Sequence, residues 1–313
     1  MIYVEMYGRL GNQLFRYVTA RVLQIKYYPD EVICISFNQI NERAKDDVTW
    51  KNELSHLKNY YIEYHKPGKV IFNETGIRQR LLCAAYYLGL RRFSESNWEK
   101  EVEYEGRFFP KLNKKGVYWF RLGYFDLGYS KYKNKFVSGA FEDPRYFDEY
   151  RELFLDELLP DRNVKEKNTE LLRQIKEGES VCVSIRRGDF FSNKNKTLHA
   201  ICDENYFKKS MEIMRKNIQK PKFVFFSDDI QWVKKNINMD GECLYETGND
   251  DVWEKLKLMS ACKHFILSNS TFSWWAQWFS LNNDKVVVAP QKWLNSGYES
   301  GLVDPDWILV KTN

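Results

Sequence analysis

The stretch Ile2-Tyr3-Val4-Glu5-Met6, followed by Gly8-Arg9-Leu10-Gly11-Asn12, decides the fold class of this chain. Its first part predicts a short strand and its second part a tight loop. The apolar spacing from Gln13 to Lys26 then predicts a helix, and Glu31 to Phe37 predicts a second strand. A strand, a glycine loop, a helix and a strand, in this order, begin a parallel α/β unit.

The C-terminal half repeats this order of elements. Because 313 residues exceed what one hydrophobic core usually organises, we expect two α/β domains, residues 1–160 and 161–313, with a cleft between them. Segment 38–135 gives a clear helical pattern only near Ile77 to Leu90, and we assign this segment to the first domain. Four apolar runs, separated by stretches long enough for helices, predict a second parallel sheet: Val181 to Ile185, Phe223 to Phe226, His264 to Leu267 and Val286 to Ala289.

The composition is that of a folded, water-soluble protein, with 43% hydrophobic and 29% charged residues and a mean hydropathy of -0.58. No basic leader precedes a long apolar stretch, so we expect a cytoplasmic protein. The longest apolar run, Leu81 to Leu90, is too short to span a bilayer. Arginines flank this run, which is typical of an interfacial membrane helix, but its nearly uniform apolar character favours a buried helix.

The net charge and the metal-ligating residue types argue against several classes of function. A net charge of +5 without a long basic block argues against a nucleic-acid binder. The six cysteines form no C-x-x-C pair and several lie inside apolar runs, so we interpret them as reduced core thiols. The four histidines lack the close spacing of a zinc site, and we interpret Asp304-Pro305-Asp306 as a surface turn. We therefore expect no metal and no cofactor.

Polar clusters follow three of the four predicted C-terminal strands. Ligands of open parallel sheets bind outside the carboxyl ends of the strands, so these clusters predict the site. They are Arg186-Arg187-Gly188-Asp189, Ser227-Asp228-Asp229 and Ser268-Asn269-Ser270-Thr271-Phe272.

The chemistry of these clusters suits a diphosphate. Side chains alternate along a strand, so Arg186 and Arg187 should point to opposite faces, with one of them pairing inside the protein, for instance with Asp189. A guanidinium binds two phosphate oxygens at once, and the Ser268 to Thr271 run can begin a helix whose first N–H groups favour an anion. Taken alone, each cluster is better explained by structure, the arginine turn by an Arg–Asp pair and the Ser268 to Thr271 run by a plain helix cap.

The first loop is less specific. Gly8-Arg9-Leu10-Gly11-Asn12-Gln13 lacks the three-glycine dinucleotide fingerprint and the lysine of a P-loop. Its glycines still permit a close approach of the backbone to a ligand, and Asn12 offers both a donor and an acceptor.

Taken together, the motifs resemble those of the α-1,2-fucosyltransferases, glycosyltransferase family 11. In family order, the matching segments are Gly8 to Phe15, Gly139-Ala140-Phe141-Glu142-Asp143-Pro144-Arg145-Tyr146-Phe147, Ser184-Ile185-Arg186-Arg187-Gly188-Asp189, Phe226 to Ile230, Ser268 to Trp275 and Pro290 to Leu294. Two positions depart from the family pattern: Ser184 replaces a motif histidine, and Lys255, beside Glu254, replaces an aspartate. Glu254 or Asp251 would then have to recognise the nucleotide base.

The resemblance implies a GT-B-type fold, in which two Rossmann-like domains face each other across a cleft. It also implies metal-independent, inverting transfer of L-fucose from GDP-fucose to the 2-hydroxyl of a galactose-terminated oligosaccharide. A lipid-linked acceptor would bring peripheral membrane contact. Arg186 would stabilise the charge on the diphosphate, while Arg187 and Asp189 would orient the loop.

Site residues follow from the same motifs. The donor-binding candidates are Arg186, Arg187, Asp189, Asp228, Glu254, Asn269, Ser270, Thr271 and Phe272. The acceptor or cleft candidates are Arg9, Gly11, Asn12, Asp126 and Glu142. Asp143, Glu142 and Asp126 compete as the general base, and Arg186, Asp143 and Asn12 are the catalytic candidates.

Two alternatives stay open. The chain could form another linkage, such as an α-1,6 or protein-O-fucose linkage, since GT-B fucosyltransferases share the arginine turn. It could instead be an inactive sugar- or nucleotide-binding homologue, because the motif histidine is lost.

Overall fold

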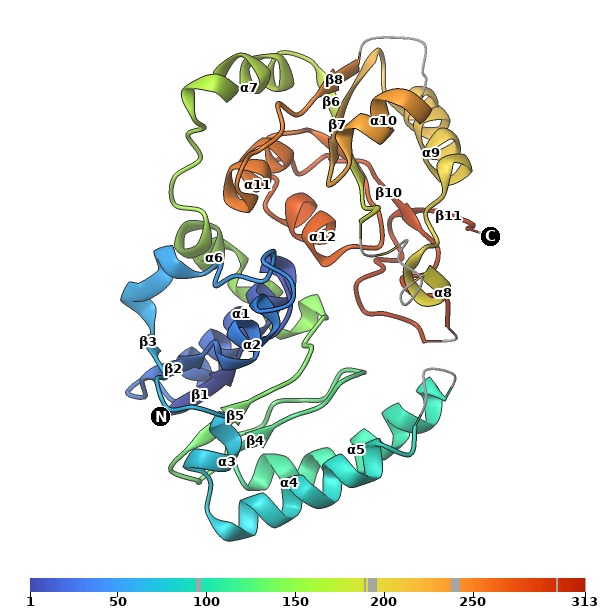
Figure 1. The fold of residues 1–313 in the computed structure, drawn as a ribbon. Coiled ribbons are helices and arrows are strands. Elements are labelled where there is room, and N and C mark those ends of the chain that lie inside the picture. The colour runs from blue at the N-terminus through green and yellow to red at the C-terminus, as the bar shows by residue number, and fades with distance from the viewer. Residues whose placement is uncertain (94–96, 189, 191–195, 238–242, 297, 313) are drawn as a thin grey trace. The chain divides into compact units, whose positions relative to one another are not determined.

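The chain forms two compact units, Met1–Leu158 and Leu159–Asn313. The structure is a computed structural model that describes residues 1–93, 97–188, 190, 196–237, 243–296 and 298–312. Each unit is built on a parallel sheet with helices on both faces (Figure 1). The predicted α/β fold with two parallel sheets is confirmed. The division lies after Leu158, whereas the sequence predicts it after residue 160. The GT-B-type pairing of the two units across a cleft stays a prediction.

The first sheet has the strand order β3-β2-β1-β5-β4, and every pair of neighbours is parallel. Because β1 lies at its centre, the loop that follows β1 opens at the middle of one sheet edge. The strands are β1 (Ile2–Glu5), β2 (Ile33–Ser36), β3 (Ile62–Glu63), β4 (Val117–Tyr118) and β5 (Lys135–Val137). The helices are α1 (Leu10–Tyr27), α2 (Asn38–Ala44), α3 (Val70–Glu74), α4 (Ile77–Leu90), α5 (Trp98–Lys114) and α6 (Arg151–Leu158).

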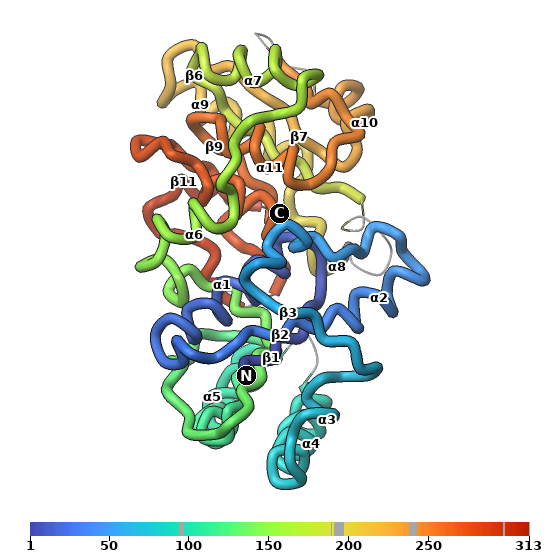
Figure 2. Tube along the Cα trace, turned by 90° about the vertical axis from the view of Figure 1, so that its left-hand side faces the viewer, coloured from blue at the N-terminus to red at the C-terminus, as the bar shows by residue number. Residues whose placement is uncertain are grey.

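The helices of the first unit lie on different faces of its sheet. Helices α1 and α2 lie on one face, and α3, α4 and α5 on the other, with α3 beside α4 (Figures 1 and 2). Tyr3 and Phe136 stack at a ring distance of 5.4 Å within the core between the sheet and α4 and α5. Tyr86 of α4 and Leu112 of α5 belong to the same core. The sheet therefore buries one side of α4 and one side of α5.

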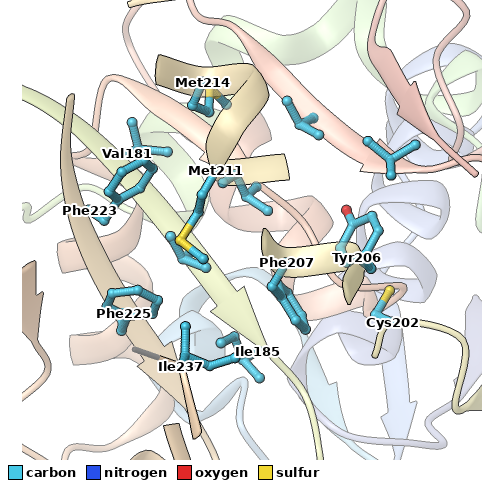
Figure 3. Close-up of a cluster of buried hydrophobic side chains, with 14 of the residues drawn as sticks. Val181, Ile185, Cys202, Tyr206, Phe207, Met211, Met214, Phe223, Phe225 and Ile237 are labelled. Carbon is cyan, nitrogen blue, oxygen red and sulfur yellow. The ribbon is translucent and has the colours of Figure 1, made fainter. Parts of the chain in front are cut away.

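The second sheet has the order β11-β10-β9-β6-β7-β8 and is also parallel throughout. One face packs on α9 and α10 through a core that includes Ile185, Phe207, Met211 and Phe225 (Figure 3). The strands are β6 (Glu179–Ile185), β7 (Pro221–Ser227), β8 (Cys243–Tyr245), β9 (His264–Ile266), β10 (Val287–Pro290) and β11 (Ile308–Val310). The helices are α7 (Thr169–Lys176), α8 (Lys196–His199), α9 (Glu204–Asn217), α10 (Ile230–Asn236), α11 (Val252–Ser260) and α12 (Thr271–Trp278).

Two predictions about individual elements need correction. Helix α1 begins at Leu10, so Gly11 and Asn12 lie in its first turn and not in the loop. Turn-forming residues are tolerated there because the first N–H groups of a helix have no intrahelical partner. Helix α4 has the predicted bounds, but Leu81 and Leu88 on its outer side are exposed, so only one face is buried. Within the described ranges, no helix is both long and apolar enough to cross a membrane.

The core between the second sheet and helices α9 and α10 allows a prediction about the stability of the protein. Phe225 is fully buried and stacks on Tyr245 at a ring distance of 5.3 Å. Replacing a buried Phe with Ala costs about 3–5 kcal/mol, so Phe225→Ala should lower the free energy of unfolding by that amount. Urea unfolding followed by tryptophan fluorescence measures the change. Leu281→Ala, at a residue that is 62% exposed, is the control and should stay within about 0.5 kcal/mol of the parent. Equal effects of the two variants would contradict this core.

Candidate active site

Three neighbouring strands bring the predicted C-terminal clusters to one edge of the second sheet. Strand β6 lies between β9 and β7, and the three are parallel, so their carboxyl ends lie side by side. Arg186 follows β6, Asp228 follows β7, and the Ser268–Ser270 run lies between β9 and α12. Asp189 lies outside the described residues.

Asp228 joins the ends of β6 and β7. One of its oxygens pairs with the Arg186 guanidinium at 3.0 Å, and the other accepts a hydrogen bond from the Arg187 backbone N–H at 2.9 Å. Gly188 allows this approach, because a Cβ at that position would lie 2.5 Å from the Asp228 carboxylate. The charge of Arg186 is thus held at the sheet edge, with about a quarter of its side chain exposed.

Arg187 has a different environment from Arg186. Its guanidinium lies 3.5 Å from the centre of the Trp232 ring on α10, whereas the Arg186 guanidinium lies 5.7 Å from the Phe190 ring. The two side chains therefore go to different partners, and a stack on Trp232 suits a residue that orients the loop.

Hydroxyl groups fasten β6 to the start of α12. The Ser184 hydroxyl is 2.6 Å from that of Ser273, which is 3.0 Å from that of Ser268. All three residues are buried. Ser184, at the position of the family's histidine, therefore works inside the protein as a structural link.

The start of α12 has the backbone geometry on which the predicted anion site depends, and the anion site itself stays a prediction. Ser270, the residue before the helix, has an extended backbone and makes no side-chain cap. Ser270, Thr271 and Phe272 are partly exposed. The first N–H groups of a helix and its positive end favour an anion at this position.

Two further donor-side candidates have internal partners. The Asn269 amide donates to the carbonyls of His199 and Trp293, both at 3.0 Å, so it joins two loops beside the site. Glu254 is buried, and one of its oxygens accepts from the Lys165 N–H at 2.7 Å and from the Asn168 amide at 2.8 Å. Glu254 thereby fastens the segment before α7 to α11.

Sequence reasoning missed Glu246, which follows β8. This buried carboxylate accepts a hydrogen bond from the Ser227 N–H at 2.8 Å and pairs with Lys255 at 2.7 Å. Lys255 is the residue that replaces the family's aspartate, so the altered position contacts a carboxylate at the sheet edge. The signal was an acidic residue directly after a strand, but β8 is only three residues long and was not recognised.

The edge of the first sheet holds a second polar cluster. β1 and β5 are neighbours, and Asn12, after β1, donates to the Glu142 carboxylate, after β5, at 2.9 Å. Gly8, with a φ of +81°, lies so close to Asn12 that a Cβ would approach its side chain to 2.7 Å. Arg9 pairs with Asp47 at 3.4 Å, and Gly11 is buried in the first turn of α1.

The surroundings of Glu142 favour the neutral form of its carboxyl group. Burial of its carboxyl raises its pKa to about 7, although the charge of Arg16 opposes the shift. Burial also lowers the pKa of Arg16 to about 10. Phe141, directly before Glu142, is buried with a φ of +54°. Non-glycine residues with this backbone are uncommon and concentrate at functional sites.

The two competing carboxylates lie in other surroundings. Asp143 caps the short turn Pro144–Tyr146, and both of its oxygens accept from the Arg145 guanidinium, at 2.9 and 2.6 Å. Asp126 is exposed, and its charge acts on Lys26 in the last turn of α1, the opposite end of that helix from Asn12. Glu142 is therefore the carboxylate that the structure brings to Asn12.

The comparisons with known proteins agree on a family. The sequence model of the family Glycosyl transferase family 11 matches residues 1–311. The chain is 34% identical to an alpha-1,2-colitosyltransferase of Escherichia coli, over 99% of each chain. It is 24% identical to the O-antigen biosynthesis glycosyltransferase WbnK of Escherichia coli, over 98% of this chain and 99% of that protein.

More distant similarities follow. The chain is 26% identical to galactoside alpha-(1,2)-fucosyltransferase 1 of Leontopithecus chrysomelas, over 55% of this chain and 49% of that protein. Among solved structures, fucosyltransferase NodZ from Bradyrhizobium aligns with a TM-score of 0.43 at 9% identity, over 89% of this chain and 92% of that one. On the family match and the full-length relative, the chain belongs to glycosyltransferase family 11.

Proposed function

We propose that this glycosyltransferase moves L-fucose from GDP-fucose to the 2-hydroxyl of a terminal β-galactoside, with inversion and without a metal ion. The observation that carries the proposal is the position of Arg186, a cation at the carboxyl edge of β6 beside the strand end that leads into α12. The α-1,2 linkage in the names of two relatives supports the choice of the 2-hydroxyl.

Arg186 and the start of α12 would act on the leaving group. As the bond between the sugar and the diphosphate breaks, negative charge builds up on the phosphate oxygens. A guanidinium stays charged at any working pH, and Asp228 holds it in place before the substrate arrives. Donors that are oriented in advance stabilise such charge most effectively. Ser270, Thr271 and Phe272 would add the N–H groups of the helix start.

Glu142 would serve the acceptor. The attacking hydroxyl must lose its proton as it bonds to the sugar carbon, and a carboxylate with a pKa near the working pH is suited to accept that proton. Asn12 would hold the carboxylate at 2.9 Å from its amide and orient it toward the acceptor.

A colitosyl donor is the second candidate. It is favoured by the 34% identity to an alpha-1,2-colitosyltransferase over nearly the whole chain. Colitose lacks one ring hydroxyl of fucose. A pocket that hydrogen-bonds this hydroxyl would discriminate strongly against the deoxy sugar, because its polar groups would be left unpaired.

The first test is product formation. Purified protein incubated with GDP-fucose and lactose should form 2′-fucosyllactose with or without EDTA, as identified by mass spectrometry and NMR. GDP-colitose in a parallel reaction decides between the donors through the ratio of kcat/KM. A different linkage would support the α-1,6 or protein-O-fucose alternative. Binding of GDP-fucose without product from lactose, N-acetyllactosamine or a lipid-linked repeat would indicate an inactive homologue.

Arg186→Ala should reduce kcat by on the order of 10²–10³, the usual effect of removing one such donor. The reason is that the charge on the departing diphosphate loses its main partner. Steady-state kinetics measure the effect, and circular dichroism checks the fold. Arg173→Ala is the matched control, because Arg173 is an exposed, ion-paired arginine on α7 in the same unit. Equal activity of both variants would sink the role of Arg186.

Substitutions at two glycines test whether Asp228 contributes to kcat by holding Arg186 in place. Gly188→Ala places a methyl group against the Asp228 carboxylate and should displace it from Arg186, which lowers kcat. Gly178→Ala meets only Lys222, at an ordinary distance of 3.6 Å, and should leave kcat unchanged.

The pKa of Glu142 predicts a pH dependence. Because the carboxyl must be ionised to accept a proton, kcat should rise as the pH passes about 7, and Glu142→Gln should abolish this rise together with most of the activity. The raised pKa also means that ionised Glu142 costs stability once the pH exceeds its unfolded pKa. Glu142→Gln should therefore unfold no more easily than the parent at neutral pH. In Asp143→Asn, kcat should still rise as the pH passes about 7. If this rise disappeared in Asp143→Asn, Asp143 would be the proton acceptor in place of Glu142.

A further inference from the structure

Helix α4 presents an apolar stripe to solvent. The α4 stripe consists of Ile77, Leu81, Ala84, Ala85 and Leu88, all of them exposed. Their spacing places them on one side of the helix. Ile77, Leu81 and Leu88 are 75%, 68% and 61% exposed, respectively. Apolar side chains that gather on one exposed surface are typical of sites that bind a protein or a membrane.

The opposite side of α4 packs into the core of the first unit and attaches the helix to it. Cys83, Tyr86 and Leu90 are buried in the core of the first unit, and the Tyr86 hydroxyl donates to buried Glu105 on α5 at 2.6 Å. A helix that is apolar on all sides is normally buried on all sides. The α4 stripe is therefore not explained by packing within the unit that carries it.

Cations surround the α4 stripe. The helix itself contains no Asp or Glu. Arg78 and Arg80 lie in its first turns, and Arg91 and Arg92 follow its last residue; all four are exposed. Next to α4, the exposed Lys69 lies 5.9 Å from the Tyr87 ring, and Phe72 of α3 is 46% exposed. Apolar side chains with flanking arginines match the two parts of an anionic lipid surface, acyl chains and phosphate headgroups.

We propose that α4 docks this enzyme on a bilayer surface that contains anionic phospholipids, with the α4 stripe at the boundary of the acyl chains and the arginines among the headgroups. A second copy of the chain fits less well. In a symmetric dimer the same patch would meet itself, and the arginines of one α4 would face those of the other without an acidic partner on the helix. The inference does not depend on which sugar is transferred, and it would bring the protein to the surface where lipid-linked acceptors reside.

Co-sedimentation of the full chain with lipid vesicles tests the proposal. The protein should bind vesicles of phosphatidylcholine mixed with phosphatidylglycerol and bind vesicles of phosphatidylcholine alone much more weakly. Leu81→Ser/Leu88→Ser should weaken binding by about tenfold or more, because it removes the apolar part of the contact. Arg78→Gln/Arg91→Gln should lower affinity roughly fivefold for each arginine removed, and only for the anionic vesicles.

The control is Leu153→Ser/Leu281→Ser, which changes two exposed leucines outside α4, at 43% and 62% exposure. This variant should bind like the parent. A second readout does not rely on loss of binding: vesicles with brominated acyl chains should quench extra fluorescence in Leu88→Trp but not in Leu281→Trp. Turnover of the lactose acceptor should be unchanged in the α4 variants, which separates this inference from the proposed reaction.

Three results would overturn the proposal. The first is absence of binding of the parent to anionic vesicles. The second is undiminished binding of Leu81→Ser/Leu88→Ser together with absence of quenching in Leu88→Trp. The third is a dimer, detected by light scattering, that dissociates in Leu81→Ser/Leu88→Ser, because a second copy would then be what covers the α4 stripe.

Discussion

The carboxylate of Asp228 forms the contacts on which the polar cluster at the edge of the second sheet depends. It accepts the Arg187 N–H on one oxygen and the Arg186 guanidinium on the other, so the first residues after β6 are tied to the first residue after β7. Parallel strands bring these residues together, but a sheet alone leaves a long arginine free to rotate. The ion pair is partly exposed, and its contribution to stability is small. What it provides is orientation of a charge before any substrate binds, which is the condition for effective electrostatic catalysis.

The polar cluster at the edge of the first sheet, Asn12 and Glu142, depends on backbone strain and burial in place of an ion pair. Phe141 takes a left-handed backbone and buries its ring 4.8 Å from that of Phe120. Packing of the ring offsets the backbone cost, and the turn carries Glu142 to Asn12. Burial then raises the Glu142 pKa, while the nearby Arg16 limits the rise. The two sheet edges thus differ in their electrostatics: one holds a fixed cation, and the other holds a carboxyl group with a pKa near neutrality.

The sequence predicted the elements that show a clear periodicity and the polar residues that follow them. It missed short elements and the contacts between residues that are far apart in the chain. The position of Arg186 and Asp228 at strand ends was predicted correctly because each follows a short apolar run. Strands β3 and β4 were missed because two residues carry no period, and α5 because Glu and Lys hide its apolar side. The burial of the outer side of α4 was predicted wrongly, since hydrophobicity does not say what covers a helix. The partner of Asn12 could not be predicted, because Glu142 lies far away in sequence and reaches it only through the pairing of β1 with β5.

The two departures from the family pattern bear on whether the site is intact. Ser184 does not simply leave a gap in place of the larger histidine side chain. Its hydroxyl forms a buried chain with the hydroxyls of Ser273 and Ser268. Breaking such a chain leaves a buried hydroxyl without its partner, at a cost of about 1–3 kcal/mol. Lys255 also has a partner. The buried Glu246 carboxylate forms an ion pair with its ammonium group and accepts a hydrogen bond from the Ser227 N–H. Both departures therefore have polar partners inside the second unit, and neither argues that the sheet edge beside Arg186 has lost its structure.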